Sequence, residues 1–449
     1  MKIRLYFLVL LSSSLIILLY QGCNNNPVVT NTNTNPSPQA STQDAKYAVQ
    51  WMDLLYNAVS NQDVNPPKAS RIYSYCSIAM YESVKNGMPN YASLSGQLNG
   101  MPTMPGISTT AIYDWPSVIA GSMPIMIRAL MDTIINITDQ SITSMANTQI
   151  AERRKATSDS IVNRSLAYGQ SIANQILTWV QTDNYIQTRT MVYNVPPRSQ
   201  NPAFWAPTDP VHLHPLEPFW GLIRTFALPN AHYCDVPMNK PFDTTAGSPF
   251  YNDALEVLNT VANLSLEQQN IALYWQDKLR TGTPAGHWVS IMNQVAGIKN
   301  LKLDETVAMY ALTCIAMADA FISCWEIKYV YNLLRPYTFI RQYIGPSNWQ
   351  SFLPIPPFPE YTSGHSTQSA AAAEVLTNLF GTNFSFTDTT LVQLGYTPRT
   401  FNSFYAARDE AAISRLYGGI HYRQAIENGK TEGALVGQTV ISRVHLKLY

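Results

Sequence analysis

The chain has 449 residues, of which 46% are hydrophobic and only 13% are charged, whereas charged residues make up roughly 25% of an ordinary globular protein. Lys and Arg together number 29 and Asp and Glu together number 29, so the formal net charge is zero. This balance excludes the basic excess of a nucleic-acid-binding protein and the high net charge of a disordered chain. We therefore expect a folded body without a nucleic-acid partner.

The N-terminus has the pattern of an export signal. Lys2 and Arg4 precede an apolar run over residues 5–20, and Gly22 directly precedes Cys23. A basic start, an apolar core and a small residue before the cut are typical of a secretory signal. A cysteine directly after the small residue resembles a bacterial lipoprotein signal, in which the cysteine is acylated and becomes the first residue. An ordinary signal peptide or an uncleaved anchor are the alternatives.

Residues 24–43 carry no charge and are rich in Asn, Thr, Pro and Ser, a composition that cannot bury a core and is typical of a flexible tether. We therefore predict a signal peptide over residues 1–22, a lipid-bearing Cys23 with a linker to residue 43, and one domain over residues 44–449. This organisation predicts an exported protein that is lipid-anchored to a bacterial membrane in the cell envelope.

Helical periodicity dominates the first half of this domain. Apolar residues recur every three or four positions along residues 48–58 and 72–84. Ser70 is a possible cap of the second of these helices and Gly87 its stop. Residues 132–180 show long amphipathic patterns.

The second half continues this pattern after an interruption. Residues 196–250 are rich in Pro and Trp and predict a long ordered loop. Ser265-Leu-Glu-Gln268 is a capping-box pattern, and a run without Gly or Pro extends from Asp304 to Arg335, before Pro336. Because strand-like alternation is scarce, we predict an all-α fold built as a large helical bundle.

The remaining cysteines show no C-x-x-C pair, so a zinc site is not expected. Cys76, Cys314 and Cys324 lie in apolar helical patterns, where buried thiols are expected. In an exported protein, a disulfide is the alternative.

Three segments near the C-terminus carry residues suited to binding an anion. Lys328 and Arg335 are seven residues apart, so a continuous helix would place both cations on one face. Ser363, Gly364 and His365 stand at or just before the start of an Ala-rich helix, where free N–H groups and the helix dipole favour negative charge.

The third segment adds Arg415 and His421. In this order the segments resemble the signature K-x6-R-P, P-S-G-H and S-R-x5-H, which vanadium-dependent haloperoxidases share with the type-2 phosphatidic acid phosphatase superfamily. Thr362 stands where the P-S-G-H segment has its Pro. Five-coordinate vanadate resembles the transition state of phosphoryl transfer, so one set of donors can serve both activities.

The resemblance implies a role for each matched residue. The oxygens of vanadate or phosphate would be bound by Lys328, Arg335, Ser363, Gly364 and Arg415. His421 would bond to vanadium, and His365 would act as general acid and base. Lys328 would also polarise the bound peroxide.

Residues around the signature favour the haloperoxidases. Trp325 and Phe358 stand at offsets that resemble the positions of a Trp and a Phe near the halide in fungal chloroperoxidase, although core packing is the alternative. The whole body looks like bacterial proteins related to vanadium chloroperoxidase, and no later stretch is a convincing membrane span. This implies vanadate as cofactor, with hydrogen peroxide, halide and an organic acceptor as substrates.

Two other functions stay open at this point. One is an acid phosphatase in which His421 forms a phosphohistidine and His365 protonates the leaving group. The other is a non-catalytic surface lipoprotein that binds glycans.

The acidic residues near these segments remain to be assigned. Ala425 stands where the signature usually has an Asp that orients the histidine, and the nearby acids are Asp409, Glu410 and Glu427. Asp277 and His287 are candidates for the mouth of the pocket, and Asp277 could pair with one of the arginines. For Asp319 we expect a buried hydrogen bond between helices.

Overall fold

The computed structural model describes residues 35–208, 214–277 and 280–448. The predicted signal peptide and Cys23 lie outside these residues. The chain divides into two units after Asn33, and every helix and strand described below belongs to the unit from Thr34 to Tyr449.

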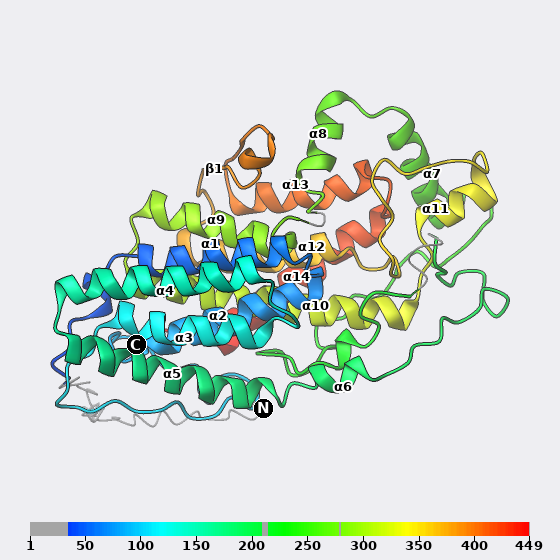
Figure 1. Cartoon of the computed structure of the whole chain (residues 1–449). Coiled ribbons are helices and arrows are strands. Elements are labelled where there is room, and N and C mark those ends of the chain that lie inside the picture. Colours follow the sequence, from blue (N-terminus) through cyan, green and yellow to red (C-terminus); the bar gives the residue numbers. More distant parts are fainter. Residues whose placement is uncertain (1–34, 209–213, 278–279, 449) are drawn as a thin grey trace, which may run out of the picture. The chain divides into compact units, whose positions relative to one another are not determined.

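Helices make up most of this unit (Figure 1). The α-helices are α1 (Lys46–Asn61), α2 (Pro66–Lys85), α3 (Trp115–Leu130), α4 (Asn136–Ala156), α5 (Asp159–Val180), α6 (Tyr185–Arg189), α7 (Pro249–Ala262), α8 (Leu266–Tyr274), α9 (Thr283–Lys299), α10 (Leu303–Tyr331), α11 (Pro336–Phe339), α12 (Gly364–Phe380), α13 (Phe404–Tyr417) and α14 (Arg423–Arg443). The shorter helical turns are η1 (Ala40–Thr42), η2 (Trp220–Leu222), η3 (Ile340–Ile344) and η4 (Val392–Leu394). Strands β1 (Phe386–Asp388) and β2 (Arg399–Phe401) pair antiparallel in a hairpin. The predicted all-α class is confirmed.

Helix α10 is the centre of the core. It packs against α2, α9, α12 and α14, and most of its side chains are buried. Its length and its mean hydropathy of 1.7 would suffice to cross a membrane, but its most apolar window is entirely buried inside the protein. Within the described residues, most of α10 is therefore surrounded by protein on all sides, as a core helix is.

Helices α3, α4 and α5 lie side by side (Figure 1). Glycines allow α3 and α5 to approach closely, because a Cβ at Gly121 would overlap the backbone of Leu166 and a Cβ at Gly169 would overlap that of Val118. A second close contact joins α12 and α14, where a Cβ at Gly433 would overlap the carbonyl oxygen of Thr367. This second contact fixes the N-terminal turn of α12.

Two of the predicted helix starts can be compared with the structure. Helix α2 begins at Pro66 and is capped by Asn65, whose side chain accepts the N–H of Lys68. The expected cap at Ser70 is wrong, since its hydroxyl donates to the Pro67 carbonyl inside the helix. The capping box of Ser265 and Gln268 is confirmed at the start of α8.

The predicted continuous helix to Arg335 is wrong. Helix α10 ends at Tyr331, and Asn332 takes a left-handed conformation with φ of 46°. Asn is one of the few residues that reach this region at low cost, and Pro336 biases the residue before it towards extended backbone. Arg335 accordingly has extended backbone and precedes α11.

The predicted loop over residues 196–250 is irregular backbone apart from η2 and the start of α7, over its described residues. Asp319 of α10 holds part of it, accepting the N–H groups of Phe226, Ala227 and Leu228. The expected bond between two helices is therefore a bond from a helix to this loop. Four cysteines, Cys76, Cys234, Cys314 and Cys324, are buried and free, so the predicted thiols are confirmed.

Candidate active site

The N-terminus of α12 provides two hydrogen-bond donors. Ser363 caps the helix: its Oγ accepts the N–H of Ser366 at 3.4 Å and the hydroxyl of Ser366 at 2.9 Å. Its own O–H proton therefore remains available to donate. The N–H of Gly364 is the first of the helix and has no intrahelical partner. A Cβ at Gly364 would stand 3.4 Å from the rings of Trp325 and Phe321.

Lys328 reaches the loop before α12 from the last turn of α10. Its side chain is buried, and its Nζ donates to the carbonyls of Pro359 at 3.2 Å, Glu360 at 3.0 Å and Thr362. Burial lowers the pKa of Lys328 to about 8. No carboxylate lies within salt-bridge distance of it among the described residues.

Arg335 reaches the same loop from the extended segment after α10. Its Nε donates to the Phe358 carbonyl at 3.0 Å, and its Nη1 donates to the Ile420 carbonyl at 2.9 Å and lies 3.2 Å from His421 Nε2. Burial lowers the pKa of Arg335 to about 10, so it stays cationic at neutral pH. Lys328 and Arg335 thus converge, but not from one helix face.

His421 has a partner on each side of its ring. Its Nδ1 lies 2.8 Å from Glu360 Oε1, and that oxygen also accepts the N–H of Tyr422 at 2.9 Å. Because this oxygen accepts, Nδ1 carries the ring proton and Nε2 keeps its lone pair on the side of Arg335. Burial, reinforced by Arg335, lowers the pKa of His421 well below its ordinary value, so the ring is neutral.

Glu360 therefore orients His421, the role that the signature usually gives to an Asp at the position of Ala425. The acids considered from the sequence lie elsewhere: Asp409 pairs with Arg408 and Lys430. Glu410 pairs with Arg399, and Glu427 with Lys430. Glu360 stands within the segment that contains the α12 cap, but its reach to His421 follows from tertiary packing that no sequence spacing encodes.

Arg415 enters from the last turn of α13. Its Nε donates to Ser414 Oγ at 3.0 Å and its Nη2 to the Trp275 carbonyl. Burial lowers the pKa of Arg415 to about 10. Like Lys328 and Arg335, it has no salt-bridge partner among the residues that the structure describes.

His365, in the first turn of α12, faces Asp277. Its Nε2 lies 3.4 Å from Asp277 Oδ2, within ion-pair distance, and neither atom has a hydrogen-bond partner in the described part of the chain. Burial and the charge of Arg415 lower the pKa of His365 to about 4. The expected pairing of Asp277 with an arginine is wrong, and Asp277 and His287 are buried rather than at a pocket mouth.

Trp325 and Phe358 pack together beside the cations. Their ring centroids are 5.0 Å apart, and Arg335 lies 4.9 Å from the centroid of Phe358. The indole N–H of Trp325 donates to the Leu216 carbonyl at 3.2 Å. The structure thus places both rings beside Lys328 and Arg335, and their halide role stays a prediction.

The arrangement suits an oxyanion. Lys328 and Arg335 are 0% exposed and Arg415 is 2% exposed, although buried Lys and Arg side chains are almost always paired with negative charge. The bare Nε2 of His421, the hydroxyl of Ser363 and the N–H of Gly364 add a lone pair and two donors. Among the described residues, no three His, Cys, Asp or Glu side chains converge to bind a metal cation.

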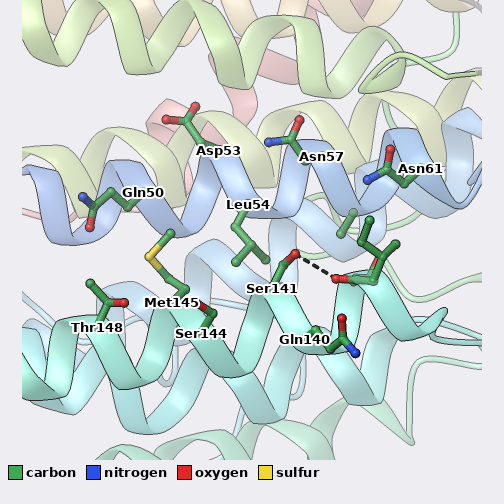
Figure 2. Close-up of a pocket in the computed structure, with 13 residues that line it drawn as sticks. Gln50, Asp53, Leu54, Asn57, Asn61, Gln140, Ser141, Ser144, Met145 and Thr148 are labelled. Atoms are coloured by element: carbon green, nitrogen blue, oxygen red, sulfur yellow. Dashed lines mark hydrogen bonds between the residues drawn. The ribbon is translucent and has the colours of Figure 1, made fainter.

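A separate groove lies between α1 and α4 (Figure 2). Its volume is about 650 Å³, and amide and hydroxyl side chains line much of it, among them Gln50, Asn57, Asn61, Gln140 and Ser141. None of the predicted site residues lines this groove. The candidate active site is therefore the buried cationic cluster.

Comparisons with known proteins place the chain beside enzymes of one kind. The family described as VCPO second helical-bundle domain matches residues 308–448. The solved structure of the first bacterial vanadium-dependent iodoperoxidase has 36% sequence identity and a TM-score of 0.84, covering 90% of this chain and 97% of its own.

Two solved structures of bacterial vanadium-dependent chloroperoxidase share the fold at lower identity. The holo form has 15% identity and a TM-score of 0.66, covering 86% of this chain and 95% of its own. The apo form has 15% identity and a TM-score of 0.67, covering 91% of this chain and 100% of its own. No curated protein sequence matches significantly.

Proposed function

The chain belongs to the vanadium-dependent haloperoxidases, and from this premise we propose that it binds vanadate and oxidises halide with hydrogen peroxide, iodide in particular. The observation that carries the proposal is a set of three buried cations that have no carboxylate partner among the described residues: one of them, Arg335, lies beside His421 Nε2, and all three lower the pKa of His421. The identity to the iodoperoxidase, 36% against 15% for the chloroperoxidases, supports iodide.

These residues fit vanadate in both charge and chemistry. The unprotonated Nε2 of His421 would form the bond to vanadium, with Glu360 holding the proton on Nδ1. Lys328, Arg335 and Arg415 would balance the charge on the oxygens, and Ser363 and Gly364 would donate hydrogen bonds. When bound, vanadate supplies a Lewis acid that activates peroxide towards halide without a change in oxidation state.

His365 is suited to move a proton. It is neutral above a pH of about 4, and with the proton on Nε2 directed at Asp277, its Nδ1 lone pair accepts a proton from peroxide. Asp277 stabilises the resulting imidazolium, which can return the proton to a product. Trp325 and Phe358 would border the halide, and the oxidised halogen would leave for an organic acceptor.

The test measures oxidation of iodide, bromide and chloride by the vanadate-loaded protein in hydrogen peroxide. We expect turnover with iodide, and a loss of about 100-fold or more in His421→Ala, which removes the nitrogen ligand. His232→Gln, a change at an exposed histidine outside the site, is the matched control. Hydrolysis of a phosphomonoester with a phosphohistidine at His421, and no halide oxidation, would establish the phosphatase instead. Oxyanion binding without either reaction would indicate a non-catalytic binding protein.

We also propose that the protein is exported to the bacterial cell envelope and held on a membrane by a lipid on Cys23. The support is the sequence of residues 1–34, with its basic start, apolar run, Gly22-Cys23 and uncharged stretch. The end of the predicted tether is part of the helical body, because η1 spans Ala40–Thr42 and Ala40 is buried in the core. Cys23→Ser should move the protein from the membrane to the soluble fraction of a bacterial host. Retention of this variant on the membrane would contradict the anchor.

A further inference from the structure

His287 of α9 lies between two buried carboxylates. Its Nδ1 is 2.8 Å from Asp277 Oδ1 and its Nε2 is 2.8 Å from Asp388 Oδ2. Its ring stacks on Trp275 with centroids 4.3 Å apart. Since each ring nitrogen faces a carboxylate, both carry a proton, and the ring is an imidazolium. Burial alone would lower the pKa of His287, but the two carboxylates outweigh it and raise the pKa to about 10.

Asp388 is held from behind by its own hairpin. Its Oδ1 accepts the N–H of Thr390 at 2.9 Å and the hydroxyl of Thr390 at 2.6 Å. The side chain of Gln294 donates to the same oxygen at 3.4 Å. These bonds leave Oδ2 directed at His287, so β1 anchors one end of a row that ends at His365. We call Asp277, His287 and Asp388 the buried triad.

We propose that His287 and Asp388 are positioning residues for the reaction at His365, where the cation between two carboxylates fixes Asp277 and offsets part of its charge. This inference rests on the proposed function, because it assigns His365 the proton transfer. A bare aspartate beside His365 would favour its protonated form. With His287 charged, Asp277 still orients His365 but attracts its proton less.

The groups around His365 and the triad act in known directions. Burial, Arg415 and His287 lower the pKa of His365, whereas Asp277 raises it. Around Asp277, burial raises the pKa, but His287 and His365 outweigh it and hold the pKa well below its ordinary value. Tyr274 donates its hydroxyl to the Asp388 carbonyl, and neutral His421 adds no charge. The cation of His287 therefore offsets the negative charge of Asp277, so that Asp277 raises the pKa of His365 less than an unpaired aspartate would.

The test follows the ring nitrogens directly. The chain has seven histidines, so nitrogen-15 labelling gives an NMR titration of the vanadate-free protein in which each ring can be assigned. In the unsubstituted protein we expect His287 to stay protonated past pH 8 and His365 to be neutral above pH 5. In His287→Gln, which keeps a donor to Asp277 but loses the cation, the pKa of His365 should rise by one unit or more.

Asp388→Asn removes one of the two negative charges that face His287 but leaves the cation beside Asp277, so it should shift the pKa of His365 in the opposite direction, downward, and by less. It also keeps the proposal testable should His287→Gln fail to fold, which thermal melting would reveal. The low-pH limb of kcat/KM for iodide should follow the pKa of His365, moving to higher pH in His287→Gln and to slightly lower pH in Asp388→Asn. His232→Gln, which removes an exposed histidine paired with Asp235, is the matched control and should shift neither quantity.

The outcomes separate the two proposals. An unchanged His365 titration in folded His287→Gln or Asp388→Asn would overturn the role of the triad, whatever the activity. Absence of halide oxidation by the unsubstituted protein would overturn the proposed function, while the titration would still decide whether the triad controls His365.

Discussion

The site contains two histidines, each beside a buried carboxyl group, and the groups behind the two carboxyls differ. Behind Glu360, the partner of His421, stands the backbone N–H of Tyr422. Burial raises the pKa of Glu360 to about 8, although the nearby cations Arg335 and Lys328 oppose this. Behind Asp277, the partner of His365, stands the His287 imidazolium, which holds the pKa of Asp277 far below that of Glu360.

This difference shows that a histidine–carboxyl contact does not define a function by itself. At His421 the carboxyl oxygen fixes which nitrogen carries the proton, and this requires an acceptor but not a full negative charge. At His365 the ionised carboxylate of Asp277 stabilises the protonated form of the histidine. The neighbouring cation of His287 weakens this stabilisation. The contact of Glu360 with His421 thus favours a nitrogen ligand, and the contact of Asp277 with His365 favours a base.

The largest effect is expected from removing the contact between Glu360 and His421. Glu360→Ala removes the acceptor of the His421 Nδ1 proton, so either nitrogen could carry it. Loss of such a partner behind a ligating histidine typically costs 10–100-fold, and we expect a loss of about 100-fold in vanadate affinity, measured by titration calorimetry.

Glu360→Gln is the matched control, because its amide oxygen can accept both the His421 and the Tyr422 protons. We expect it to retain affinity within about tenfold of the unsubstituted protein. An equal loss in both variants would mean that the charge of Glu360, and not its acceptor oxygen, supports His421.

The two pairs also differ in how far the sequence could predict them. Ser363 and Gly364 were predictable because a helix start is set by local sequence, and the order of the segments indicated Lys328, Arg335, Arg415 and His421. The route of Arg335 was not predictable from periodicity, because the left-handed turn at Asn332 ends the helix early.

The acids were beyond the reach of the sequence. Glu360 contacts a histidine 61 positions later, and His287 meets an aspartate 101 positions later on a short strand. No period or motif spacing connects such positions, because tertiary packing alone brings them together. The prediction therefore identified the anion-binding cations and His365 as the acid and base, but it did not assign the carboxyl partner of either histidine.

A smaller effect, on stability, is expected from disturbing the close contact between α12 and α14. Gly433→Ala places a Cβ against the carbonyl oxygen of Thr367, one turn into the helix that carries His365. Overpacking against backbone typically costs 1–3 kcal/mol, and we expect a loss of roughly 2 kcal/mol in the free energy of unfolding, measured in urea. Gly297→Ala is the control, since a Cβ at Gly297 meets nothing within 4 Å. Equal stability of the two variants would contradict the close contact of α12 with α14.

The smallest effect isolates the cation behind Asp277 through the pH dependence of stability. The pKa of His287 is about 10 in the folded protein, against an ordinary value of 6.5 in the unfolded chain, so the folded state binds one more proton between these pH values. Its contribution is fully present below pH 6.5 and is lost as the pH rises through about 10. Other groups titrate in the same window, so the measured quantity is the difference in unfolding free energy between the unsubstituted protein and His287→Gln. Between pH 7 and 8 this difference should shrink by about 1 kcal/mol, since one pKa unit corresponds to about 1.4 kcal/mol. A difference that stays constant over this interval would mean that His287 is neutral in the folded protein and that Asp277 keeps its full charge beside His365.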